Sequence, residues 1–124
     1  MREQYKIECS QCTIDDKTRE YLCPYCITQK IFKAKWKLLI YWHLNQGTKR
    51  FNELSRLIPA TQTTLSRQLK ELETDEIILR KVYPQIPPKV EYSLTPLGEK
   101  FLKTLEAMNS FGLEFFKAAE NQKQ

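Results

Sequence analysis

The sequence predicts a mostly helical α+β fold that carries one two-stranded β-hairpin. Two observations predict it. Apolar residues recur at helical spacing in successive segments between residues 35 and 74, and two β-rich segments follow, separated by a run of prolines. At 124 residues, with 41% hydrophobic and 28% charged residues, the chain has the size and composition of one globular domain with a short attachment. We therefore expect a single hydrophobic core.

The first predicted helix spans residues 35–45. Its apolar positions recur as they do on one face of a helix, and Asn45-Gln46-Gly47 supplies a C-terminal stop. The positions that share this face are Trp36, Leu39, Ile40, His43 and Leu44. Since His43 is the only histidine and lies on an apolar face, we expect it to pack into the core rather than to bind a ligand.

Two further helices follow, with a short turn between them. Residues 51–57 place Phe51, Leu54 and Leu57 on one face before Ile58-Pro59 ends the helix. A third helix runs to about residue 74, and Thr61 can cap it by accepting a hydrogen bond from a backbone N–H two or three residues on. Leucines at positions 65, 69 and 72 line one side of this helix. The opposite side is polar and carries Thr63, Thr64, Ser66, Arg67, Lys70 and Glu71.

Residues 77–83 and 89–94 predict the two strands of a hairpin, because both are rich in β-branched and aromatic residues in rough alternation. Pro84, Pro87 and Pro88 lie between them. Prolines cannot donate ladder hydrogen bonds, so the tip is expected to project as a stiff loop.

A last helix is predicted to open at Thr95-Pro96, where a threonine cap precedes a proline in the first turn. Its apolar positions are Leu97, Phe101, Leu105 and Met108, and Phe111, Leu113, Phe115 and Phe116 continue its apolar character past Gly112. Apolar residues at this spacing on a terminal helix favour a core or a dimer interface over a ligand pocket.

This order of helix, short helix, turn, third helix and hairpin is that of a winged helix-turn-helix, with a two-stranded β wing and terminal dimerisation helices. In that arrangement the third helix fits the major groove of double-stranded DNA, and the hairpin tip lies beside the backbone or the minor groove. Gln62 and Arg67 are the candidates for base reading, because Gln pairs bidentately with adenine and Arg with guanine. The remaining DNA-binding candidates are Arg50, Thr61, Thr63, Thr64, Lys70, Arg80, Lys81 and Lys89.

Five segments carry a resemblance to a known family: CP at 23–24, KW at 35–36, RFNEL at 50–54, LSRQLKELE at 65–73 and PPKVEYSLT at 87–95. Through them, the chain from Cys23 to about Phe116 resembles HxlR-type winged-helix transcriptional regulators. The resemblance implies a homodimer that binds a near-palindromic operator, with the first and last helices forming the dimer interface. Its half-sites would lie about one helical turn, roughly 34 Å, apart.

The four cysteines form two pairs, Cys9-x-x-Cys12 and Cys23-x-x-Cys26, separated by residues 13–22. This spacing can deliver four thiolates tetrahedrally to one Zn²⁺, and such a closed site would be structural. One alternative is a redox switch at Cys23, where the resembled family often carries a cysteine and some members sense oxidants; Cys23 also lies near a helix start, which favours the reactive thiolate. The other alternative is a set of inert thiols.

The expected organisation is a cysteine-rich segment at 1–26 that holds the zinc knuckles, a winged helix-turn-helix domain at 27–119 with a C-terminal dimerisation helix, and a flexible tail at 120–124. A net charge of +5 suits a polyanionic partner. No apolar run reaches the roughly 20 residues that span a bilayer and no signal-peptide core opens the chain, so we expect a cytoplasmic protein without a membrane partner.

An enzyme is not expected. No catalytic set of Ser, His and an acid is expected around the one histidine, no Gly-rich phosphate loop is present, and the CxxC pairs lack the βαβ surroundings of a thiol oxidoreductase. The alternative function is a zinc-stabilised winged-helix module that contacts proteins without sequence-specific DNA binding.

Overall fold

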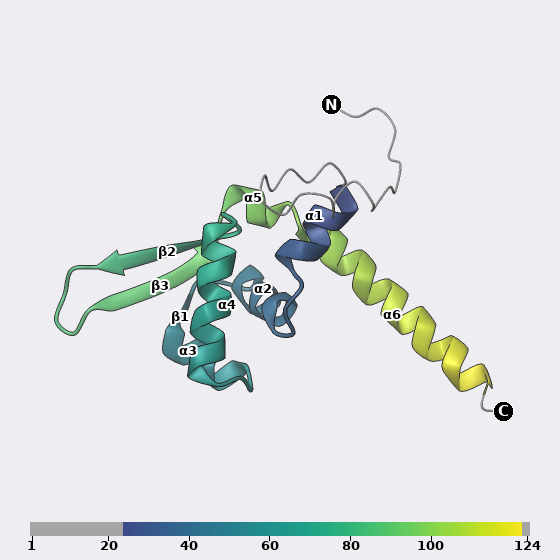
Figure 1. Cartoon of the computed structure of the whole chain (residues 1–124). Helices are drawn as coiled ribbons and strands as arrows, with labels where there is room; N and C mark the ends of the chain where they lie inside the picture. The colour runs from purple at the N-terminus through teal and green to yellow at the C-terminus, as the bar shows by residue number, and fades with distance from the viewer. Residues whose placement is uncertain (1–23, 123–124) are drawn as a thin grey trace. The chain divides into compact units, whose positions relative to one another are not determined.

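A computed structural model describes residues 24–122 of the chain. The described residues fall into two compact units, residues 24–35 and residues 36–122. The first unit holds one helix, α1 (Pro24–Ile31) (Figure 1). In this helix the Thr28 hydroxyl donates a hydrogen bond of 2.8 Å to the carbonyl of Pro24. All other described elements belong to the second unit.

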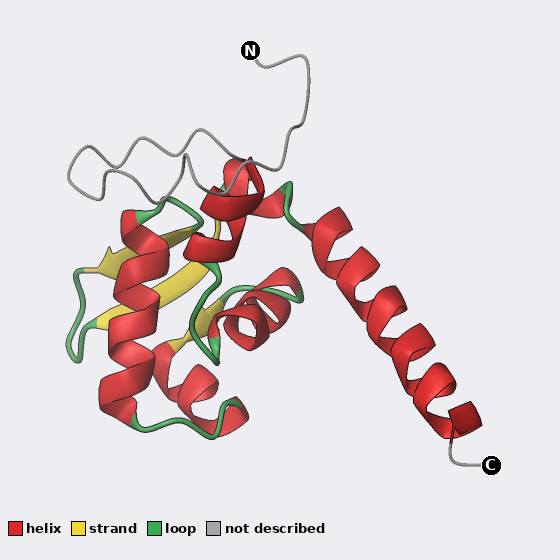
Figure 2. Ribbon diagram, turned by 45° about the vertical axis from the view of Figure 1, so that its right-hand side comes forward, coloured by secondary structure: helices red, strands yellow, loops and turns green. Residues whose placement is uncertain are grey.

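The three central helices confirm the predicted helix-turn-helix order. They are α2 (Lys37–Asn45), α3 (Phe51–Leu57) and α4 (Gln62–Thr74), so only α2 differs at its start, by beginning at Lys37 rather than at residue 35. Thr61 caps α4 as predicted, because its side-chain oxygen accepts a 3.1 Å hydrogen bond from the backbone N–H of Thr64. The helices pack closely: α4 contacts α2 and β2, and α2 contacts β3 (Figure 2).

The sheet has three antiparallel strands, in the order β1-β3-β2. The hairpin strands β2 (Ile78–Tyr83) and β3 (Lys89–Leu94) were predicted, and Tyr83 pairs with Lys89 to close the tip over residues 84–88 (Figure 1). The additional strand β1 (Lys49–Arg50) pairs with β3 and lies directly before α3. Two residues are too short for any alternation to show in the sequence, so the prediction of a two-stranded sheet missed it.

The core of the second unit lies between α2, α3, α4 and the start of β2. Its fully or nearly fully buried apolar residues are Ile40, Tyr41, Leu44, Leu54, Ile58, Leu65, Leu69, Leu72, Ile77 and Ile78. On α2 the buried face is therefore that of Ile40, Tyr41 and Leu44, and His43 is only half-buried, which corrects its predicted place in the core. Partial burial and the nearby ammonium of Lys49 lower the pKa of His43.

The predicted last helix is divided in two. A short helix α5 (Pro96–Glu99) opens under the Thr95 cap, and α6 (Leu102–Gln122) follows it. At the junction, the N–H groups of Lys100 and Phe101 donate to carbonyls three residues back, which tightens the turn and ends α5. Helix α6 then continues to Gln122, into the segment for which a tail was predicted, and none of its residues is buried.

The residue that follows the end of α4 has a backbone conformation that residues other than glycine rarely adopt. The N–H of Ile77 donates to the carbonyl of Leu72 at 3.0 Å and the N–H of Glu76 donates to that of Glu73, with Glu76 at a φ of 61°. This is the left-handed position that closes many helices and that is usually glycine.

We therefore expect Glu76→Gly to raise the free energy of unfolding by about 0.5–1 kcal/mol, because glycine adopts this conformation without a Cβ penalty. Chemical denaturation of the purified chain measures it. Glu76→Ala is the matched control: it removes the same carboxylate but keeps the Cβ, and it should bring no gain. An equal gain in both variants would assign the effect to charge and contradict the backbone explanation.

Among residues 24–122, no helix has the length and apolar character needed to cross a membrane.

Candidate nucleic-acid interface

Helix α4 has two chemically distinct faces. The face turned to the core is lined by Leu65, Gln68, Leu69 and Leu72, all of them buried. The opposite face is exposed along the whole helix and carries Gln62, Thr63, Ser66, Arg67 and Lys70. The apolar periodicity alone decides this division, because leucines three and four residues apart must share one side of a helix. The result is a rigidly mounted helix with a polar, basic surface.

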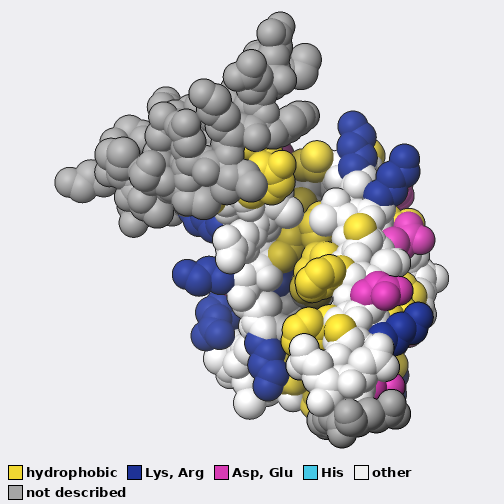
Figure 3. All heavy atoms as spheres, turned by 90° about the vertical axis from the view of Figure 1, so that its right-hand side faces the viewer, with side chains coloured by type: hydrophobic (Ala, Val, Ile, Leu, Met, Phe, Trp, Pro, Cys, Tyr) yellow, Lys and Arg dark blue, Asp and Glu magenta, His cyan; other side chains and the backbone are white. Residues whose placement is uncertain are grey.

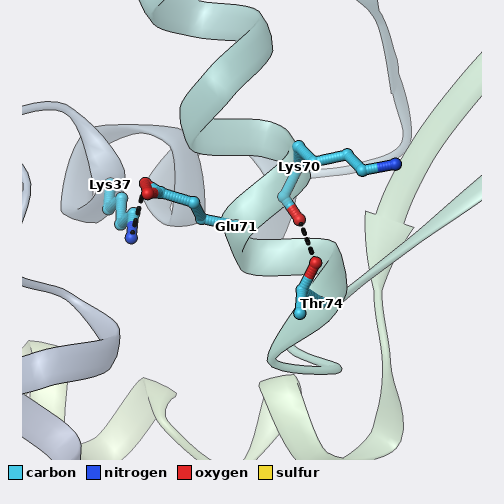
Figure 4. A network of polar contacts seen from close by, with 4 residues as sticks. All are labelled: Lys37, Lys70, Glu71 and Thr74. Carbon is cyan, nitrogen blue, oxygen red and sulfur yellow. Dashed lines mark hydrogen bonds and ion pairs between the residues drawn. The ribbon is translucent and has the colours of Figure 1, made fainter. Parts of the chain in front are cut away.

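An ion pair fixes α4 against α2. The Lys37 ammonium lies 3.1 Å from the Glu71 carboxylate, and the Lys37 side chain is only 6% exposed (Figure 4). A buried ammonium needs such a partner, so the pair favours one orientation of the two helices. Lys70 is adjacent in sequence but points away from this pair, and only its backbone carbonyl is engaged, by the Thr74 hydroxyl at 2.9 Å (Figure 4). The ammonium of Lys70 therefore lies on the exposed face. Glu71 was predicted on the polar side of this helix, and its carboxylate instead pairs with Lys37 of α2.

The predicted DNA-contact residues at the N-terminus of α4 fall into two groups. Thr61 and Thr64 bond to each other: the Thr61 oxygen accepts from the Thr64 N–H, and the Thr61 hydroxyl lies 2.9 Å from the Thr64 hydroxyl oxygen. Both hydroxyls therefore contribute to the cap. Gln62 and Thr63 are exposed in the first turn of the helix, where backbone N–H groups also attract anions.

The β2–β3 hairpin carries a cluster of charges around one tyrosine. The ammonium groups of Lys81 and Lys89 each lie 4.9 Å from the centre of the Tyr83 ring, and Lys89 also pairs with Glu91 at 3.3 Å. Hydrogen bonds from Tyr83 and Lys89 lower the pKa of Glu91. Lys89 was predicted to contact phosphate, and the structure gives it an intramolecular carboxylate partner. Arg80 and Lys81 are the exposed cations of this hairpin.

The unpredicted strand β1 brings Arg50 to this cluster. Arg50 pairs with Glu91 on β3, and Glu91 pairs with Lys81 on β2, so one carboxylate lies between two cations across the sheet. The Arg50 backbone N–H donates to the Glu53 carboxylate at 3.1 Å, which begins α3 at this point. The sequence indicates Arg50, Lys81 and Lys89 separately as candidates for phosphate contact. It does not indicate that Glu91 joins them, because the short strand β1 carries no pattern.

The cysteines are only partly within the described residues. Cys26 lies half-buried on α1, whereas Cys9, Cys12 and Cys23 lie outside residues 24–122. Within that range, no three side chains of His, Cys, Asp or Glu come together as metal ligands would.

Known proteins are similar to this chain in sequence and in architecture. Residues 31–120 match the HxlR-like helix-turn-helix family. Over 91 residues the chain is 45% identical to the HTH-type transcriptional regulator YybR of Bacillus subtilis (strain 168). The aligned region covers 73% of this chain and 73% of YybR. An HTH-type transcriptional regulator of Methanothermobacter thermautotrophicus is 41% identical over 103 residues, 82% of this chain and 79% of its own.

Solved structures of regulators are also similar to this chain. The redox regulator HypR in its reduced form has a TM-score of 0.74 at 41% identity, over 79% of this chain and 98% of its own. The reduced form of the transcriptional regulator YodB from B. subtilis has a TM-score of 0.68 at 35% identity, over 76% of this chain and 94% of YodB. Both proteins are named as regulators, and their structures match the winged-helix architecture described above. The chain therefore belongs to the HxlR-like helix-turn-helix family and is a transcriptional regulator of that type.

Proposed function

We propose that the chain regulates transcription by binding double-stranded DNA sequence-specifically, as a homodimer on a near-palindromic operator. The exposed face of α4 carries this proposal. The Lys37–Glu71 pair and four buried side chains fix the helix, so the backbone that carries its polar side chains is ordered before binding. A preformed helix loses less backbone entropy on binding, which favours its insertion into the major groove.

The side chains take different roles in this proposal. Gln62 and Arg67 contact base edges, with Thr63 beside them in the first turn, because amide and guanidinium groups can pair bidentately with adenine and guanine. Phosphates are contacted by Lys70 and by the exposed cations Arg50, Arg80 and Lys81. Thr61 and Thr64 act through the cap that holds the first turn in place.

The test is a comparison of two duplexes at one salt concentration, one selected from a random pool by the chain itself and one of scrambled sequence. Fluorescence anisotropy should give an affinity about 10³-fold or more higher for the selected duplex. The alternative function, a winged-helix module for protein contacts, predicts weak affinity and a ratio near one. That result would contradict the proposed function.

The homodimer is proposed on the basis of α6. Met108, Phe111, Phe115 and Phe116 are 47–72% exposed, and Figure 3 shows hydrophobic side chains at the surface of this helix. A contiguous apolar surface of this kind is typical of an interface rather than of a solvated helix. A second copy of the chain covers it most simply, since an isologous contact pairs the same stripe with itself.

We expect sedimentation to give a dimer for the native chain and a monomer for Phe115→Glu, which places a carboxylate in the stripe. Lys117→Glu is the control, because it adds the same group on a different side of α6 and should leave the dimer intact. A dimer that persists in Phe115→Glu would place the interface elsewhere.

We further propose that Cys9, Cys12, Cys23 and Cys26 hold one structural Zn²⁺. The donor set supports it, since two CxxC pairs supply the four thiolates that zinc prefers in closed sites. Metal content and free-thiol count on one anaerobically purified sample should give about one zinc per chain and four masked thiols. Absence of metal together with reactive thiols would contradict the zinc site and favour redox sensing through Cys23.

Redox control is supported by the relatives, because HypR has been solved in reduced and oxidised forms. In this chain, two thiolates would give two electrons to hydrogen peroxide, which takes up two protons and leaves as two waters, while the sulfurs form a disulfide. The zinc site would thereby lose two ligands. If peroxide expelled the zinc and the affinity for the selected duplex stayed unchanged, the coupling between the cysteines and DNA binding would be wrong.

A further inference from the structure

The tip of the β2–β3 hairpin presents a large branched apolar side chain, that of Ile86, to solvent. Ile86 is 100% exposed, the highest value among the exposed large hydrophobic residues of the described chain. It lies in the uncharged segment 84–88, in which Pro84, Pro87 and Pro88 have no N–H group. The N–H of Gln85 is used within the chain, donating to the Tyr83 carbonyl at 2.9 Å. The tip therefore carries one large branched hydrocarbon group, three exposed prolines without N–H donors, and one side-chain amide, that of Gln85.

The strands that lead to this tip are basic. Arg80 and Lys81 are exposed on β2, and Lys89 flanks the Tyr83 ring at the point where the tip closes. An uncharged tip on a cationic stem is complementary to a surface with anionic edges and an apolar interior. A DNA groove has this character, since phosphates border it while sugars and stacked bases line it.

The width of the minor groove limits which part of the hairpin can enter it. Paired strands lie about 4.8 Å apart before their side chains are counted, and the minor groove is only about 6 Å wide. The two strands together do not fit into the groove, whereas one side chain at the tip does.

On the basis of the proposed DNA binding, the geometry points to Ile86 as a wedge that enters the minor groove and unstacks a base step. Apolar side chains inserted in this way kink the duplex by about 20–90°. The phosphates on both sides of the groove are then within reach of the basic stem. The wing thus adds a bend to the sequence reading of α4, and it favours sites with an easily unstacked step under the tip.

Three variants of the full chain test the wedge on the selected duplex, labelled at both ends for energy transfer. Ile86→Thr keeps a β-branched residue but makes the tip polar, and it should weaken binding about tenfold and reduce the bend. Val82→Thr makes the same chemical change on the stem, where Val82 is 50% exposed, and should bind and bend as the native chain does. Ile86→Leu keeps an apolar tip and should retain both properties. Because Ile86 is fully exposed, thermal unfolding should be the same in all Ile86 variants.

Base substitutions under the wing then identify the groove. Inosine–cytosine pairs keep the minor-groove face of A·T pairs, whereas G·C pairs add an amino group there. With a wedge in the minor groove, the native chain should tolerate the first substitution and lose affinity and bend on the second. Ile86→Thr should respond to neither.

The outcomes separate the wedge from the proposed function. If Ile86→Thr binds and bends the duplex as the native chain does, the wedge is wrong and DNA binding stands. If the native chain itself does not distinguish selected from scrambled duplex, the proposed function fails. If Ile86→Thr instead changes only the sedimentation of the free chain, the tip contacts another copy of the chain, and the wedge is wrong.

Discussion

Gly98→Ala should lower the free energy of unfolding by about 3 kcal/mol. A Cβ on Gly98 would overlap the carbonyl oxygen of Ile77, and this neighbour is backbone that cannot rotate away. The same carbonyl accepts from the N–H of Thr95 at 3.0 Å, and the Thr95 hydroxyl accepts from the N–H of Gly98 at 2.9 Å. Moving either segment would therefore disrupt the cap of α5.

Gly98 also joins α5 to the core through its own carbonyl. The buried Tyr41 hydroxyl donates to it at 2.5 Å, and the Tyr41 ring packs edge-on against Phe101 with 5.3 Å between ring centres. Burial, and secondarily the nearby Glu99 carboxylate, raises the pKa of Tyr41, so this hydroxyl keeps its proton and remains a donor.

Chemical denaturation of the two variants Gly98→Ala and Gly112→Ala measures the effect of the close approach. Gly112 also lies in a helix, but a Cβ there meets nothing within 4 Å in the single chain. Its replacement should raise the free energy of unfolding, by up to about 1 kcal/mol, through helix propensity. If the two variants behaved alike, the contact between Gly98 and Ile77 would not limit stability.

The second large effect is expected at Arg67. Arg67→Ala should weaken binding to the selected duplex about 10–100-fold and leave the affinity for scrambled duplex nearly unchanged, because a bidentate base contact contributes about 1–3 kcal/mol of discrimination. Arg67 is exposed at the middle of the α4 face, while the helix itself is held by buried leucines. The substitution should therefore not affect folding.

Lys70→Ala is the matched control on the same helix face. A phosphate contact carries no sequence information, so its loss should weaken both duplexes to the same degree and reduce the salt dependence by about one unit of slope. Anisotropy titrations at several salt concentrations distinguish the two cases. If Arg67→Ala weakened both duplexes equally, Arg67 would be a phosphate contact and base reading would lie with Gln62 and Thr63.

The local elements of this protein could be predicted from its sequence. Helix α3, the cap and end of α4, and both hairpin strands lie where the patterns place them, within one residue. Each has a local cause: leucines that share a helix side, a threonine that caps the following turn, and β-rich segments that prolines interrupt. The exposed face of α4 follows from the same periodicity, so the main candidate residues for DNA contact were predictable too.

Other features depend on neighbours that are distant in sequence, and no local pattern reports them. Strand β1 exists because β3 offers a partner edge, and Tyr41 rather than His43 is buried because its hydroxyl finds the carbonyl of Gly98, 57 residues away. The charge row of Arg50, Glu91 and Lys81 joins three strands. The sequence alone thus determined the helix-turn-helix, the hairpin and the polar face of α4, because those depend on short-range periodicity. Only the tertiary structure decided the third strand, the burial of Tyr41 and the Lys37–Glu71 pair, because these depend on long-range packing.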